Sequence, residues 1–154
     1  MEKIIRHGNR GTCRLDYDKA HREMAYFTFA GLEQTGIVDH FFSTRYGGGS
    51  SDYLYSLNFS YAQGDIKEHV DENFRRAAAH MNMTSSDIVC SQQTHTTNVR
   101  KVTALDKGKG VVCERDYTDV DGLITNEKGI ILATFYADCV PLFIVDPVHQ
   151  AIGL

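Results

Sequence analysis

A carboxyl group and a thiol interrupt the most apolar stretch of the chain, residues 130–146. Two apolar runs, 130–136 and 140–145, are each long enough for a buried strand, and Asp138 and Cys139 lie between them. Aspartate is rarely buried without a partner, and a thiol at the end of a strand can act as a nucleophile or bind a metal. The alternative is structural, with Asp138 in a turn and Cys139 in the core. This joint is the first candidate site.

His95 is the second candidate, because it lies in a polar segment between two short apolar runs, 88–92 and 98–102, which are predicted to be strands. Imidazole and thiolate are both good zinc ligands, and rigid strands can hold them at the short distances that zinc requires. A catalytic zinc needs three protein ligands and an open position, so His95 and Cys139 leave one ligand unidentified. His149 is nearest in sequence, but it lies in an expected turn and is interpreted as a surface residue.

The same two residues also support chemistry without a metal. A histidine within hydrogen-bond reach of Cys139 would lower the pKa of its thiol, and Asp138 or another acid would orient the imidazole ring. That arrangement predicts a cysteine hydrolase or transferase. The pair His95 and Cys139 therefore leaves two classes of enzyme open.

Arg45 stands just before three consecutive glycines, residues 47–49. A guanidinium group offers a fork of two donors, and exposed backbone N–H groups beside it would suit phosphate or carboxylate. The segment is not a nucleotide-binding P-loop, because no Lys-Ser or Lys-Thr follows the glycines. A flexible turn is the alternative interpretation.

The composition favours one domain, residues 1–154, with a core of its own, since 42% of the residues are hydrophobic and 23% are charged. The net charge is -4 and no basic stripe is present, so we expect no extended nucleic-acid surface, although a small anion needs only local cations. No apolar run has the length of a signal peptide or of a membrane span. We therefore expect a cytoplasmic protein that does not bind membranes.

One long helix is predicted at 65–81, with Asp65 capping its amino end. Its apolar residues recur at helical spacing, namely Ile66, Val70, Phe74, Ala77, Ala78 and Met81. A polar face is expected to lie in solvent and comprises Lys67, Arg75 and Arg76. Further strands are predicted at 24–29 and 37–43, and the dipeptide 121–122 is interpreted as a turn.

The carboxyl end is predicted to form a hairpin, with a strand at 142–145, a turn at 147–150 and a returning strand at 151–154. A strand that stops within an apolar run leaves an unpaired edge, to which another chain can add. We therefore expect a truncated fold that is the first part of a longer protein, and self-association through this edge.

Four separated motifs give the chain a resemblance to a known family. They are FSTRYGG at 42–48 followed by SLN at 56–58, GD at 64–65 with Val70 and Asn73, QTH at 93–95 with Val99, and ADCVP at 137–141. In this order and spacing, the sequence resembles the multicopper polyphenol oxidoreductases, or laccase-domain proteins, now regarded as purine nucleoside phosphorylases. The likeness extends from about residue 40 to the end of the chain.

The resemblance implies roles for individual residues. His95 and Cys139 match two of the family's three zinc ligands, and the third is a histidine in a segment that would follow residue 154. Thr96 stands where the family has glycine. Arg45 and Ser43 are implied to bind the substrate, with Arg45 holding phosphate.

The implied fold is α+β, with mixed sheets sandwiched between helices, similar to bacterial cysteine-dependent toxin hydrolases. The implied activity is zinc-dependent cleavage of adenosine, inosine or methylthioadenosine by phosphate, which gives the free base and ribose 1-phosphate, with deamination of adenosine as a side activity. The older oxidase name implies copper, but the seven histidines include no His-x-His pair, so the sequence does not favour it. A folded but catalytically silent fragment is the alternative that is not an enzyme.

Overall fold

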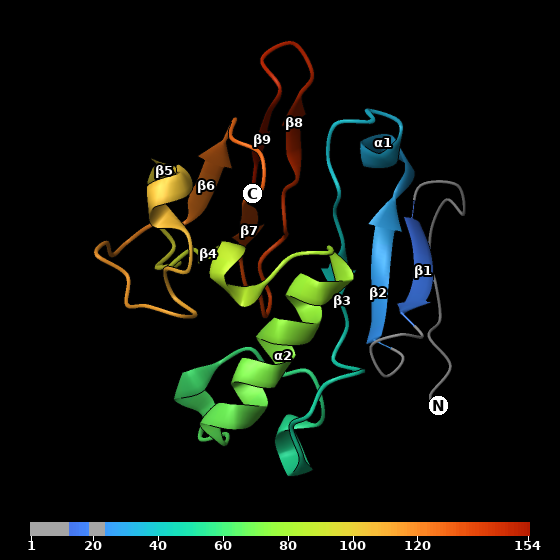
Figure 1. The fold of residues 1–154 in the computed structure, drawn as a ribbon, viewed down its shortest axis with the longest axis vertical. Coiled ribbons are helices and arrows are strands. Elements are labelled where there is room, and N and C mark those ends of the chain that lie inside the picture. Colours follow the sequence, from blue (N-terminus) through green and yellow to red (C-terminus); the bar gives the residue numbers. More distant parts are fainter. Residues whose placement is uncertain (1–12, 19–23) are drawn as a thin grey trace.

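A computed structural model describes residues 13–18 and 24–154 and contains three small sheets arranged around one long helix (Figure 1). The sheet orders are β1-β2-β3, β4-β7 and β5-β6-β9-β8. The strands are β1 (Cys13–Asp18), β2 (Met24–Phe29), β3 (Phe42–Ser43), β4 (Ile88–Cys90), β5 (Val99–Lys101), β6 (Gly122–Thr125), β7 (Ile131–Ala133), β8 (Ile144–Asp146) and β9 (Ala151–Gly153). The helices are α1 (Ala30–Glu33) and α2 (Lys67–His80), with 3₁₀ turns at Asp52–Leu54, Tyr61–Gln63, Ser85–Asp87 and Ala104–Asp106.

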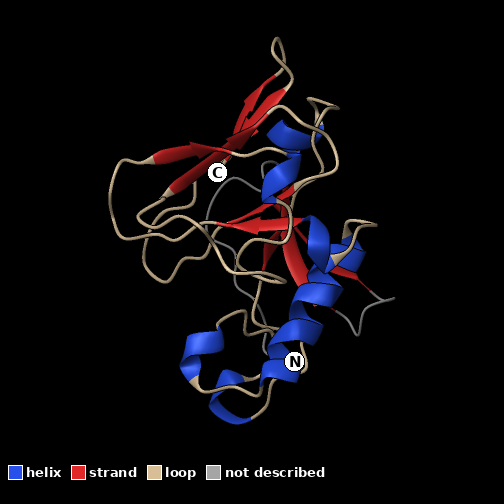
Figure 2. Ribbon diagram, turned by 60° about the vertical axis from the view of Figure 1, so that its left-hand side comes forward, coloured by secondary structure: helices blue, strands red, loops and turns tan. Residues whose placement is uncertain are grey.

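The parallel pair β4 and β7 lies between α2 and the four-stranded sheet. Successive side chains of a strand point to opposite faces, and the core divides accordingly. Ile88 and Cys90 pack with the helix residues Val70 and Phe74, whereas Val89 packs in the other cluster. In Figure 2, the four-stranded sheet lies above and α2 lies below. Two apolar clusters on either side of β4 and β7 thus join the helix to the sheet.

The carboxyl end of α2 packs against the first sheet through His80. Its Nδ1 lies 2.7 Å from a carboxylate oxygen of Asp18, and its ring lies 4.2 Å from the ring of Tyr26 between centroids. Phe41 meets the same imidazole edge to face. One half-buried histidine therefore links β1, β2 and the segment before β3 to the helix.

The predicted α+β class is confirmed, and so are the strand at 24–29 and the hairpin formed by β8 and β9. Several strands are shorter than predicted, and the runs 88–92 and 98–102 keep only β4 and β5. The run 37–43 keeps only β3, and the runs on either side of Cys139 keep only β7 and β8. Val140 and Leu142 are 79% and 64% exposed. The apolar pattern therefore predicted strands that are too long, because no neighbouring strand pairs with these residues.

The predicted helix is confirmed, but two details of it were wrong. The carboxylate of Asp65 accepts hydrogen bonds from the amide of Asn58 and from the backbone of Ile66, and it does not cap α2, which begins at Lys67. Arg76 is 3% exposed instead of solvated, because its guanidinium donates to the Gly47 carbonyl at 2.8 Å. Sequence periodicity could not reveal this distant carbonyl.

The unpaired edge expected at the end of the chain is also corrected. β9 pairs with β6 on one side and with β8 on the other, so it is an interior strand of its sheet. Its last neighbour, Leu154, exchanges two hydrogen bonds of 2.9 Å with Leu123. Self-association stays a prediction, but it cannot use β9 as an open edge.

Within the described segments, no helix is long and apolar enough to cross a membrane.

Acid should destabilise the protein through Asp87, which closes a capping box with Thr84 and lies 2.8 Å from the Lys107 ammonium. The hydrogen bond from Lys107, followed by those from Thr84, lowers the pKa of Asp87 to about 2. Because the folded state resists protonation, its stabilisation is present above the ordinary carboxyl pKa and is lost as pH falls toward 2. We expect Asp87→Asn to cost about 1 kcal/mol at pH 6 and little at pH 2.

Urea unfolding at the two pH values measures this difference. Lys107→Met, which removes the cation, should also reduce the loss of stability on acidification. An Asp87→Asn variant that loses as much stability on acidification as the unchanged protein would contradict this role of the carboxylate.

Candidate metal and substrate site

The loops that carry His95 and Cys139 leave the same edge of the molecule. β4 and β7 are parallel neighbours, with Cys90 opposite Ala133. The segment 91–95 continues from the end of β4, and the segment 134–139 continues from the end of β7. Loops beyond the carboxyl ends of adjacent parallel strands are a common place for ligands. The topology therefore starts the two loops that carry the predicted ligands at one edge, although these loops lie far apart in sequence.

His95 lies on an exposed loop with a backbone φ of 64°, in the left-handed region. The residues on both sides of it are held by one carboxylate, since Thr94 N and Thr96 N donate to Asp121 at 2.9 and 3.0 Å. These backbone N–H groups, that of Thr94 first, lower the pKa of Asp121. Asp121 was interpreted only as a turn residue. Its contacts span 27 residues of sequence, so no local pattern could have revealed them.

Cys139 is partly exposed in the loop between β7 and β8, and Asp138 beside it is exposed. Cys90, by contrast, is 1% exposed in the core, and burial raises the pKa of its thiol to about 12. The donor types of His95 and Cys139 suit zinc. Across residues 13–18 and 24–154, no three His, Cys, Asp or Glu side chains gather closely enough to hold a metal ion.

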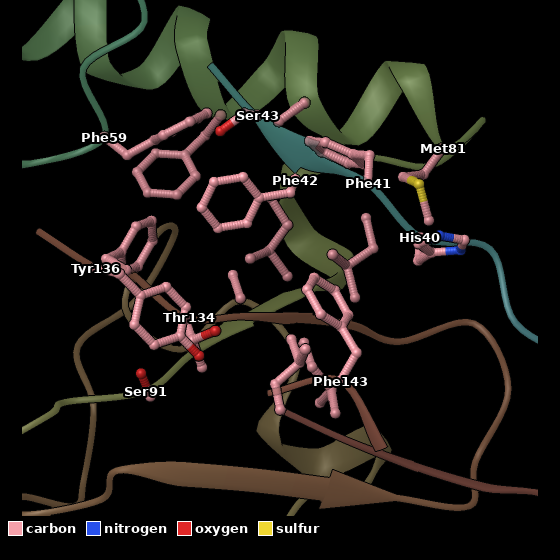
Figure 3. A pocket seen from close by; sticks show the side chains of 18 of the residues that line it. His40, Phe41, Phe42, Ser43, Phe59, Met81, Ser91, Thr134, Tyr136 and Phe143 are labelled. Carbon is pink, nitrogen blue, oxygen red and sulfur yellow. The ribbon is translucent and has the colours of Figure 1, made fainter. Parts of the chain in front are cut away.

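A cavity of about 750 Å³ lies between β3, α2 and the loops after β4 and β7. Figure 3 shows aromatic rings among the side chains of its wall, and it groups three hydroxyl-bearing residues, Ser91, Thr134 and Tyr136, on one side. Ser91 and Thr134 are the first residues of the loops that lead to His95 and Cys139. Neither His95 nor Cys139 is among the described residues that line the cavity. The polar side of the cavity thus reaches the edge from which both loops depart.

The structure places both predicted substrate-binding residues, Ser43 and Arg45, in the cavity wall. Arg45 already uses part of its fork, because Nε donates to the Tyr55 carbonyl at 2.7 Å and Nη2 lies 3.5 Å from that of Tyr53. Among the described residues, Nη1 has no hydrogen-bond partner. Arg45 therefore keeps donors for an anion, and its contact with Tyr55 restricts where they can point.

The backbone donors expected beside Arg45 are not available for an anion, which corrects the interpretation of the glycine run. The N–H groups of Gly47 and Gly48 donate to the Ser56 hydroxyl at 3.1 Å each, and that of Gly49 donates to Asn73 at 2.7 Å. The glycines instead permit close packing. A Cβ on Gly47 would lie 2.2 Å from the Met24 Cα, and Gly47 has a φ of 98°.

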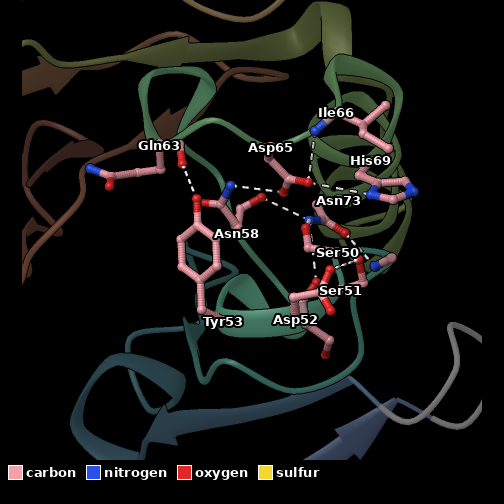
Figure 4. Close-up of polar contacts among 12 residues, drawn as sticks. Ser50, Ser51, Asp52, Tyr53, Asn58, Gln63, Asp65, Ile66, His69 and Asn73 are labelled. Atoms are coloured by element: carbon pink, nitrogen blue, oxygen red, sulfur yellow. Dashed lines mark hydrogen bonds and ion pairs between the residues drawn. The ribbon is translucent and has the colours of Figure 1, made fainter.

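Asn73 of α2 fixes the loop that carries Arg45 (Figure 4). Its side chain is completely buried, and its amide nitrogen donates to the Ser50 hydroxyl at 2.9 Å and to the Asn58 carbonyl at 2.7 Å. With the Gly49 contact, this one amide joins three points of the loop to the helix. Asn73 belonged to the motif recognised in the sequence, but its function as the anchor of the loop was not predicted.

His40 also lines the cavity, and burial lowers the pKa of its imidazole. Its Nε2 accepts a hydrogen bond of 2.8 Å from the backbone N–H of Phe29, which requires an unprotonated Nε2. Its ring stacks on that of Phe29 at 5.8 Å between centroids. His40 is therefore a neutral residue of the wall, and its Nε2 is not available to a ligand.

Known proteins are similar to this chain in sequence and in fold. The sequence profile described as multi-copper polyphenol oxidoreductase laccase matches residues 39–154. Purine nucleoside phosphorylase YlmD of Geobacillus stearothermophilus is 37% identical over 116 residues, which cover 73% of this chain and 41% of that protein. The protein of the same name from Bacillus subtilis is 39% identical over 117 residues, with the same coverage of 73% and 41%.

Solved structures agree with the sequence comparisons. The crystal structure of Bacillus licheniformis hypothetical protein YfiH has a TM-score of 0.75 and 31% identity, covering 83% of this chain and 47% of that one. The structure of YlmD from Geobacillus stearothermophilus has a TM-score of 0.64, covering 72% and 42%. The chain spans less than half the length of these relatives. It belongs to the multi-copper polyphenol oxidoreductase laccase family, whose members include proteins named purine nucleoside phosphorylases.

Proposed function

We propose that a protein containing this chain is a zinc-dependent purine nucleoside phosphorylase. Its substrates are adenosine, inosine or methylthioadenosine together with phosphate, its products are the base and ribose 1-phosphate, and deamination of adenosine is a side activity. The names of the relatives support phosphorolysis. The observation that carries the proposal within this chain is the shared edge of β4 and β7, from which the loops of His95 and Cys139 depart.

His95 and Cys139 would hold the zinc, with a third ligand from outside the described residues. Bound zinc supplies a Lewis acid that makes a coordinated water acidic near neutral pH. Both residues lie on loops supported by a parallel strand pair, which favours a defined separation between their donor atoms. The chain's own part in metal binding is thus to present one imidazole and one thiolate.

Arg45 would hold the phosphate and Ser43 would contact the substrate, since both line the cavity. A fixed cation stabilises negative charge without reorganising during the reaction. The contact of Arg45 Nε with the Tyr55 carbonyl supplies such fixation. The apolar wall beside them suits a purine ring, and the hydroxyls of Ser91 and Thr134 suit polar groups of a nucleoside.

The test is an assay of base release from adenosine by a full-length protein that contains this chain, with and without inorganic phosphate. We expect adenine and ribose 1-phosphate only when phosphate is present, about one zinc per chain, and slower formation of inosine. Equal release of base without phosphate would contradict phosphorolysis. A protein that is inactive on all three nucleosides although it carries zinc would favour the alternative of a catalytically silent fold.

The metal-free cysteine hydrolase predicts a different behaviour of Cys139. With chelator present at pH 7, an activated thiolate should be alkylated by iodoacetamide much faster than an ordinary thiol. Under the zinc proposal, we expect ordinary reactivity for Cys139 without metal and protection of Cys139 when zinc is added. Cys90 provides an internal control that stays unmodified in the folded protein, since it is buried and the pKa of its thiol is raised. Mass spectrometry of the alkylated peptides measures both sites.

A further inference from the structure

The loop of His95 requires support that its own sequence does not supply. A φ of 64° is uncommon for a non-glycine residue, and contacts with the surroundings help to stabilise it. The side chain of His95 is exposed, so packing of the imidazole does not impose this conformation. Contacts of the neighbouring residues provide such support.

Most of those contacts go to Asp121, while the Thr94 hydroxyl donates to Oδ1 of Asp119 at 3.0 Å and the Thr96 hydroxyl donates to the Asp119 carbonyl at 3.3 Å. Oδ1 of Asp121 accepts from Thr94 N at 2.9 Å, and its Oδ2 accepts from Thr96 N at 3.0 Å, so one carboxylate grips the backbone on both sides of His95. The Thr96 hydroxyl lies 3.1 Å from Oδ1. The hydroxyl of Thr96 adds a contact to Asp121 that a glycine at this position could not make.

The position of Asp121 is itself fixed by the sheet. Its backbone N–H donates to the Asn98 carbonyl at 3.0 Å, and the next residue, Gly122, begins β6 opposite Val99 of the parallel strand β5. A carboxylate at the start of a paired strand moves little relative to its sheet. Through Asp121, the backbone around His95 is therefore held by the four-stranded sheet as well as by β4.

We propose that Asp121 is a positioning residue for His95. Its carboxylate holds Thr94 and Thr96 so that the imidazole is presented at the edge where the Cys139 loop also departs. This inference rests on the proposed function for the role of the imidazole as a metal ligand. The geometry of the loop stands without that role, and the two claims can be tested separately.

Asp121→Asn is the informative variant, because an amide of the same shape keeps one acceptor and places an N–H₂ donor where the other oxygen received Thr96 N. Asp116→Asn is the matched control. It removes a carboxylate from the same 113–121 segment, one that lies 2.9 Å from the Lys109 ammonium and contacts no residue of the His95 loop. Both variants change the net charge equally.

Two readouts are needed. NMR measures hydrogen exchange of the Thr94 and Thr96 amides and the backbone coupling of His95, which reports its φ. We expect Asp121→Asn to speed exchange at Thr96 about tenfold or more and to shift the His95 coupling toward a value averaged over conformations.

Competition with a chromophoric chelator measures affinity for Zn²⁺. Loss of a group that orients a metal ligand typically weakens metal binding about 10-fold to 100-fold, and we expect a change in this range. Asp116→Asn should change both readouts less than twofold.

An Asp121→Asn protein that keeps the exchange rates and the His95 coupling of the unchanged protein would overturn the inference, whatever its zinc affinity. If the loop loosens but zinc affinity stays the same, Asp121 has a structural role only and the positioning of a ligand is refuted. If zinc binding survives His95→Ala, the proposed role of His95 is wrong, and the NMR readout still decides whether Asp121 holds the loop.

Discussion

Replacing His95 or Cys139 by alanine, in a full-length protein that contains this chain, should lower phosphorolysis of adenosine by more than about 100-fold. Loss of a residue that hydrogen-bonds to a metal ligand already lowers metal affinity or activity by up to about 100-fold, and loss of the ligand itself should lower them more. Each variant should also release the zinc. Steady-state rates and zinc content per chain measure the two effects.

The two substitutions should act as a unit. Because one metal ion needs both donors, the double variant should be scarcely worse than either single variant. His149→Ala and Cys113→Ala are the controls, since both residues are exposed and lie outside the proposed site. We expect wild-type zinc content and rates for these two. Full activity in a zinc-free Cys139→Ala protein would show that the chemistry uses other residues.

Sequence patterns were most informative where local contacts decide the structure. The run 24–29 forms β2, and the apolar face of α2 is buried at Val70 and Phe74 as its periodicity predicts. Propensity and periodicity depend on neighbouring residues, so these elements could be predicted without knowledge of the fold. Strand lengths could not, because a strand extends only as far as its partner does. The runs around Cys139 show this, since β7 and β8 have three residues each.

Long-range polar contacts account for most of what the sequence did not reveal. Arg76 was expected in solvent and lies buried against the Gly47 carbonyl, and Asp121 was expected to serve only as a turn residue but holds the loop of His95. In each case the side chain satisfies a backbone group more than twenty residues away. Such pairs leave no periodic signal. Their consequences for the site are large, because they decide which loop residues are rigid.

The candidate site shows the same division between local and distant information. The types of His95 and Cys139 indicated zinc chemistry, and the parallel pairing of β4 with β7 explains how the two loops that carry them begin at one edge. Motif likeness also placed Arg45 and Ser43, which lie in the cavity wall. It did not predict that the glycine N–H groups beside Arg45 are all engaged within the protein. An anion at this wall must therefore be held by side chains.

Asn73→Ala is expected to lower the free energy of unfolding by about 3 kcal/mol, because it leaves buried polar groups without partners. The Gly49 N–H loses its acceptor, and the Asn58 carbonyl loses a donor at 2.7 Å. Asn73 itself is completely buried, so water cannot replace these bonds without opening the loop. Urea unfolding should show a lower midpoint with an unchanged slope.

The same variant should loosen the wall of the cavity. Arg45 depends on the anchored loop, because its carbonyl accepts from Ser56 N and Leu57 N at 2.9 and 2.8 Å, and Ser56 lies within reach of the Asn73 amide. We therefore expect KM for phosphate to rise more than kcat falls in a full-length protein. Asn126→Ala is the matched control, since Asn126 is exposed and its loss should change the stability by less than about 0.5 kcal/mol. Equal stability of the two variants would mean that the buried amide does not anchor the loop, and that the rigidity of Arg45 comes from its own contact with Tyr55.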